Sequence, residues 1–145
     1  MRSPEQVVWD MVRQWLRRAE EDLLVARELM ERDRLSYNPV GFHAQQAAEK
    51  FLEGLLTRHQ IPFPKTHDIE ELLTLAEKRS PGIQEDLRVA EILSPYGVEV
   101  RYPDERPDLN REQGVEALRL ANHVRAAVMQ RLDDYLRAGS PGTER

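Results

Sequence analysis

Residues 41–52, which read Gly-Phe-His-Ala-Gln-Gln-Ala-Ala-Glu-Lys-Phe-Leu, decide the fold of this chain. Apolar residues recur in this stretch and just beyond it at intervals of three or four, which is the period of one face of an α-helix. That face carries Ala44, Ala47, Ala48, Phe51, Leu52 and Leu55. Because the alanines are small, we expect a second helix to pack closely against this face. The helix is expected to begin at Pro39, with Asn38 as its N-cap, and to end near His59.

The rest of the chain shows the same helical period, and we find no convincing alternation of the kind that predicts a strand. A first helix is expected from about Pro4 to Asp33. Its apolar stripe consists of Val8, Val12, Trp15, Ala19, Leu23, Ala26 and Met30. Two shorter helices are expected, one ending near Arg79 and one beginning after it. A long last helix follows Asn110 and Gln113, whose spacing is that of a capping box.

Three prolines fall within residues 94–110, namely Pro95, Pro103 and Pro107. They deny this segment a long helix, so we expect a loop, and a loop of this length in a compact domain is often functional. The sequence therefore predicts an all-α fold, an up-and-down bundle of four to five antiparallel helices. We expect one domain, residues 1–138, followed by a flexible C-terminal tail, residues 139–145.

The composition limits the classes of function. The chain has 145 residues, a formal net charge of -5 and no cysteine, which excludes disulfides, thiolate zinc sites and a cysteine nucleophile. An acidic protein is not expected to coat nucleic acid generally, although a local basic groove stays open. The sequence has no apolar run long enough to span a membrane and no signal-peptide core, so we expect a cytoplasmic protein with no membrane partner.

Three stretches together resemble the HEPN family, the helical domain usually partnered with a minimal nucleotidyltransferase. The first is residues 15–26, the second is residues 41–52 followed by Pro-Lys-Thr-His-Asp-Ile at 64–69, and the third is Arg-Tyr-Pro-Asp at 101–104. The resemblance covers roughly residues 12 to 136.

The resemblance implies a helical bundle that forms a homodimer and works beside a minimal nucleotidyltransferase, as in a toxin–antitoxin or related pair. Many HEPN proteins are metal-independent endoribonucleases. Their signature is an arginine, four to six intervening residues and a histidine, and two such motifs meet across the dimer. None of the four histidines of this chain has that spacing. The nearest arrangement is Arg119 and His123, with three residues between them.

The loop residues Arg101, Tyr102 and Asp104 form the first candidate site. An arginine offers two parallel donors to a phosphate, and a nearby carboxylate orients that arginine or accepts a proton. We therefore treat Arg101 and Asp104 as candidate catalytic residues, and Arg101 and Tyr102 as candidate phosphate-binding residues. The competing interpretation is structural, because an arginine–carboxylate pair also serves to fasten a loop to a bundle.

A second candidate site lies on the central helix. His43, Gln46 and Lys50 are three and four residues apart, so they share one helical face and are expected to bind a phosphate or a nucleobase. The same face would also suit a dimer contact. His67 precedes a helix N-terminus, where anions are favoured, and is a third candidate catalytic residue; the alternative is that it belongs only to a capping turn. No metal site and no cofactor are expected.

Three functions remain open. The first is a HEPN-like component of a toxin–antitoxin or nucleotide-linked stress system that binds RNA or a nucleotide phosphate. The second is an active metal-independent endoribonuclease that uses an unusual arrangement of residues. The third is a nucleotide-binding helical bundle without chemistry of its own.

Overall fold

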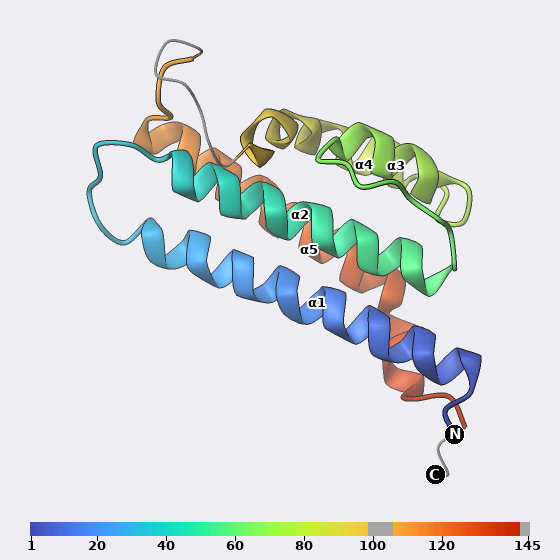
Figure 1. Ribbon diagram of the computed structural model, residues 1–145. Coiled ribbons are helices and arrows are strands. Elements are labelled where there is room, and N and C mark those ends of the chain that lie inside the picture. Colours follow the sequence, from blue (N-terminus) through green and yellow to red (C-terminus); the bar gives the residue numbers. More distant parts are fainter. Residues whose placement is uncertain (99–105, 143–145) are drawn as a thin grey trace.

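The computed structural model describes residues 1–98 and 106–142, and all regular structure within these ranges is helical (Figure 1). The predicted all-α fold is therefore confirmed. The elements are α1 (Pro4–Leu29), α2 (Asn38–Arg58), α3 (Ile69–Glu77), α4 (Ile83–Leu87), the 3-10 helix η1 (Arg88–Gly97) and α5 (Arg111–Ala138).

The three long helices form the body of the bundle. Figure 1 shows α1 and α2 side by side and antiparallel, with α5 behind α2 and running in the same direction as α2. The shorter elements α3, α4 and η1 form a layer along the other side of α2. Helix α2 is thus covered by the other elements everywhere except along an outer strip.

The small face of α2 is the centre of the core. Ala44, Ala47, Ala48 and Phe51 have no solvent exposure, as the sequence predicts for a helix approached closely by its neighbours. The buried stripe of α1 differs from the predicted one at two positions within the helix, and Met30, at the C-cap, is only partly buried. Trp9 and Leu16 are buried, whereas Val8 and Trp15 are only partly buried.

The ends of the helices follow local sequence signals in part. The capping box of Asn110 and Gln113 is confirmed, because each side chain binds the backbone N–H of the other residue. The assignment of Asn38 as an N-cap is wrong: Tyr37 is the N-cap residue and Asn38 is the first helical residue. The amide of Asn38 instead joins the chain before α5, donating to Asp108 Oδ1 and accepting from Leu109 N.

Two helix boundaries also differ from the prediction. Helix α1 ends at Leu29 instead of near Asp33. Regular structure continues through η1 to Gly97, with Pro95 inside it, where the sequence predicts a loop from residue 94. Ala90 and Leu93 are fully buried, so packing against the bundle holds this segment in a 3-10 conformation despite the proline.

The chain just after α5 has one contact with the start of α1. Gln6 Nε2 donates to the Pro141 carbonyl at 3.1 Å, so the first turns of α1 hold this part of the predicted tail. In the described part of the chain, no helix is both long and apolar enough to cross a membrane.

Candidate functional site

A strip of polar side chains follows the outer face of α2 and continues onto its neighbours on both sides. We call this strip the outer band. Its residues are Asp22 from α1, Gln45, Gln46, His43, Glu49, Lys50 and Glu53 from α2, and His67 from the segment before α3. The band brings together all the described residues of the predicted sites.

On the α1 side of the band, the carboxylate of Asp22 binds both the ammonium group of Lys50 and the imidazole of His43. Lys50 Nζ lies 2.5 Å from Asp22 Oδ2, and His43 Nδ1 lies 2.9 Å from Asp22 Oδ1. A carboxylate only accepts hydrogen bonds, so Nδ1 of His43 carries the hydrogen and Nε2 of the neutral ring is an acceptor. Asp22 therefore fixes both the position of Lys50 and the tautomer of His43.

On the other side of α2, a single oxygen of Glu49 is the centre of the network. Glu49 Oε2 accepts from Gln45 Nε2 at 3.3 Å, from Gln46 Nε2 at 3.1 Å and lies 3.1 Å from His67 Nδ1. Glu49 is 7% exposed, whereas more than half of the His67 side chain is open to solvent. The same tautomer argument leaves Nε2 of neutral His67 as an acceptor.

The backbone around His67 explains why the side chain reaches α2. Gln45, which is fully buried, donates from Nε2 to the His67 carbonyl at 3.0 Å. Asp68 caps α3 by accepting from Glu70 N, so the helix begins directly after the cap. At Gly97 an added Cβ would stand 2.9 Å from His67 Cβ and from Gln45, so glycine lets η1 close over this point.

Glu53 lies one helical turn after Glu49 and is 6% exposed. Burial and the nearby Glu49 carboxylate raise the pKa of Glu53 to about 8, and Lys50 opposes this change. At the neighbouring residue Gly54, Trp15 lies against α2 and meets Phe63 edge to face with ring centroids 6.1 Å apart. The raised pKa favours the neutral, protonated form of Glu53 at pH 7.

The two histidines of the band lie on different flanks of α2. His43 and Glu49 are six residues apart, which separates them by about 120° around a helix with 100° per residue. His43 reaches toward α1, and Glu49 reaches toward the segment that carries His67. The band thus presents two separate carboxylate–imidazole pairs, with Gln46 between them.

Arg119 and His123, the nearest match to the ribonuclease motif, lie outside the outer band. Arg101, Tyr102 and Asp104 are outside the described residues. Arg119 binds Glu116 through two nitrogens, at 2.9 and 2.6 Å, and His123 Nε2 lies 3.0 Å from the Asp86 carbonyl. Arg119 and His123 therefore have different partners and form no common site.

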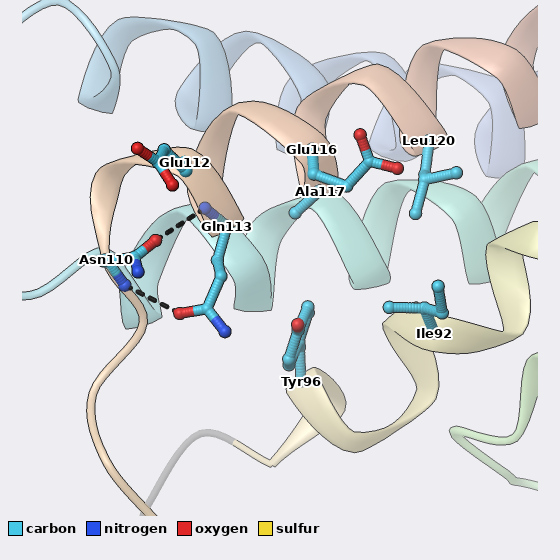
Figure 2. A pocket seen from close by; sticks show the side chains of 8 residues that line it. All are labelled: Ile92, Tyr96, Asn110, Glu112, Gln113, Glu116, Ala117 and Leu120. Atoms are coloured by element: carbon cyan, nitrogen blue, oxygen red, sulfur yellow. Dashed lines mark hydrogen bonds between the residues drawn. The ribbon is translucent and has the colours of Figure 1, made fainter.

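A hollow of about 340 Å³ lies away from the outer band, between η1 and the start of α5 (Figure 2). Figure 2 shows Tyr96 and Ile92 below it and Gln113 pointing down from α5, where Asn110 forms its capping box. Glu112 and Glu116 also line the hollow, and Glu116 is bound by Arg119, which lowers the pKa of Glu116. None of the predicted site residues that the structure describes lines this hollow.

Four residues of the band are absent from the sequence prediction. The sequence places Asp22 on the solvated face of the first helix, and Glu49 and Glu53 have a spacing that is usually surface charge. Gln45 stands among the alanines of the core face, and a polar residue in an apolar stripe is a signal of a buried hydrogen bond. Glu49 and Glu53 offer no such signal in the sequence, and the partners of Glu49 include His67 from the segment before α3, 18 residues further along the chain.

The outer band suits a ligand bound through hydrogen bonds and charge. It offers hydrogen-bond donors and acceptors, two imidazoles, one ammonium group and one neutral carboxyl group. Among the described residues, no group of three or more histidine, cysteine, aspartate or glutamate side chains is placed to hold a metal ion.

Known proteins share both the sequence pattern and the fold of this chain. The HEPN domain family matches residues 12–132. TT1696 from Thermus thermophilus is similar in structure, with a TM-score of 0.68 and 34% identity over 82% of this chain and 96% of that one. ST0689, described as an archaeal HEPN homologue, has a TM-score of 0.66 and 26% identity over 83% of this chain and 97% of that one. The search of curated proteins found no match. The chain belongs to the HEPN domain family.

Proposed function

We propose that this HEPN-domain protein binds RNA or a nucleotide through phosphate at the outer band. In this proposal it acts as a homodimer and as the partner of a minimal nucleotidyltransferase, within a toxin–antitoxin or nucleotide-linked stress system. The ligand-binding residues are His43, Gln46 and Lys50, joined by Arg101 and Tyr102 of the proline-rich loop. The observation that carries the proposal is the attachment of His43 and Lys50 to the two oxygens of Asp22.

That attachment supports phosphate binding because it orders two donors in advance. Lys50 has two further N–H groups besides the one directed at Asp22, and His43 adds a second N–H when it is protonated. An ordered donor loses less conformational entropy when it meets a phosphate than a free surface lysine does. Gln46, between the two flanks, supplies a neutral amide to the same surface.

The charges of the band predict the character of the binding. Asp22 offsets the charge of Lys50, and Glu49 offsets any charge on His67. The whole chain also carries a net charge of -5. We therefore expect weak binding to RNA of arbitrary sequence, and we expect it to fall steeply as salt is raised. Tight binding that resists salt would contradict this proposal.

The test is a titration of fluorescein-labelled single-stranded RNA, followed by fluorescence anisotropy. Replacing Lys50 by glutamine is expected to weaken binding by about tenfold, the effect of one charge-assisted hydrogen bond. Lys78→Gln is the matched control, because Lys78 is an exposed lysine at the end of α3 and outside the band. Equal affinity of the parent and Lys50→Gln would remove the band from the proposal.

A second candidate function is metal-independent cleavage of RNA, and one feature favours it. Glu49 orients His67 with its Nε2 available as a base, and Glu53 is a neutral acid one turn away from Glu49. A carboxyl group whose pKa is raised toward neutrality, as that of Glu53 is, has the property expected of a general acid. Under this proposal His67, Arg101 and Asp104 take part in the reaction at the 2′-hydroxyl and the phosphate.

Cleavage of total RNA in the presence of EDTA tests this second function. Activity in the parent that is lost in both Arg101→Ala and His67→Ala would support it. No cleavage by the parent, together with heat stabilisation by added nucleotide, would favour the third alternative of a nucleotide-binding bundle without chemistry.

A further inference from the structure

A groove between α1 and α5 is a second feature of the protein surface, separate from the outer band. It has a volume of about 360 Å³ and its floor is apolar. The two helices are joined across it at two places, by the ion pair of Glu20 with Arg125 and by the rings of Trp9 and Tyr135, 5.1 Å apart. The residues that line the groove are Arg13, Leu16, Arg17, Glu20, Met129 and Leu136.

The charges of α1 change sign within one short segment near the middle of the helix, residues 13–22. Residues 17–21 read Arg-Arg-Ala-Glu-Glu, so basic residues precede Ala19 and acidic residues follow it. Arg17 and Glu21 are exposed, one turn apart on one face, and neither forms an ion pair with another described residue. Ala19 itself is buried, but a two-fold axis that crosses the exposed face of α1 at the level of Ala19 would place Arg17 of each copy opposite Glu21 of the other.

The same two-fold axis also determines where the apolar side chain of Leu24 would meet the second copy. Leu24 is 48% exposed and lies on the same face as Arg17 and Glu21. It follows Ala19 by five residues, or about 7.5 Å at 1.5 Å per residue. The position five residues before Ala19 is Gln14, which lies between Arg13 and Arg17 on the rim of the groove. An antiparallel second copy would therefore bring its own Leu24 to the groove, and the exchange would be reciprocal.

We propose that α1 pairs antiparallel with α1 of a second copy of this chain, with Leu24 of each copy in the α1–α5 groove of the other. Arg17 of each copy then pairs with the partner's Glu21. The apolar floor and the exposed leucine favour a protein partner over a nucleic acid, since aliphatic side chains offer bases no ring for stacking. This inference rests on the homodimer of the proposed function and assigns its interface.

Charge reversal on the full chain tests the pairing. Arg17→Glu gives two acidic positions that face each other across the axis, and Glu21→Arg gives two basic positions. Each variant alone is expected to dimerise at least about tenfold more weakly than the parent in analytical ultracentrifugation, because both symmetric pairs become repulsive. An equimolar mixture of the two variants is expected to recover the dimer, since each variant is complementary to the other.

Arg88→Glu and Glu71→Arg are the matched controls, because both residues are exposed and lie on η1 and α3. Circular dichroism establishes that every variant retains its helices. A parent that stays monomeric at about 100 µM would overturn both the homodimer and this interface. A parent dimer that survives both reversals, or that a mixture fails to restore, would overturn this interface alone and leave the homodimer of the proposed function intact.

Discussion

Lys50 of α2 and Asp22 of α1 form an ion pair with Nζ and Oδ2 2.5 Å apart, and this pair links the two neighbouring helices at the outer band. The other oxygen of Asp22 holds His43. Asp22 is only 13% exposed, so these two partners supply the hydrogen bonds that water supplies to an exposed carboxylate. The same contact therefore contributes to stability and to the proposed binding of phosphate.

Replacing Lys50 by methionine is expected to destabilise the fold by about 1–3 kcal/mol, because the nearly buried Asp22 carboxylate loses its main partner. Urea unfolding followed by circular dichroism measures this change. The double variant Asp22→Asn with Lys50→Met is expected to recover part of the loss, since no unpaired charge then remains. Equal stability of the parent and Lys50→Met would show that water satisfies Asp22 without the lysine.

The buried carboxyl of Glu53 predicts a stability that depends on pH. Its pKa is raised to about 8, whereas the same group ionises near its ordinary value when the chain unfolds. Between these values the folded protein binds more protons than the unfolded chain, so stability falls as pH rises from about 5 to about 8, by at most about 1.4 kcal/mol per pH unit for one group. Below this window Glu53 contributes no such dependence.

Glu53→Gln removes this titration and is the variant for comparison. Its free energy of unfolding is expected to match that of the parent near pH 5 and to exceed it increasingly up to pH 8. Parallel pH profiles for the two proteins, measured by urea unfolding, would mean that Glu53 ionises freely in the folded state.

Gly97→Ala tests the close approach of η1 to the band. The new methyl group would stand 2.9 Å from the Gln45 amide and from His67 Cβ. Gln45 is fully buried and donates a hydrogen bond to the His67 carbonyl, so it cannot move away from the new methyl group without losing that bond. We expect a loss of about 1–3 kcal/mol, as for overpacking in a core. Thermal unfolding measures it, with Val98→Ala at an exposed neighbouring position as the control.

The fold could be predicted well from local sequence signals. The alanine face of α2 and the capping box at Asn110 depend on residues close together in the chain, and the structure has both. The register of the buried stripe on α1 is harder to predict, because Trp9 and Leu16 lie only one position away from Val8 and Trp15. Neighbouring positions on a helix differ by about 100°, so a broad apolar arc permits either choice.

The site could be predicted only in part. His43, Gln46 and Lys50 follow from helical spacing, and the structure attaches His43 and Lys50 to Asp22 and links Gln46 to His67 through Glu49. The sequence does not predict these joining carboxylates, since their roles depend on contacts between segments about 20 residues apart. The same reason explains η1, where packing of Ala90 and Leu93 overrides the signal of a proline in a helix.

The most direct test of phosphate binding at the outer band is an NMR titration of the ¹⁵N-labelled protein with a short single-stranded RNA. We predict that the amide signals of His43, Gln46, Lys50 and His67 shift together and saturate at one RNA concentration. Signals from the hollow beside Tyr96 and Glu112 should stay in place. Shifts confined to that hollow, or no saturable shift anywhere on α2, would contradict the proposal.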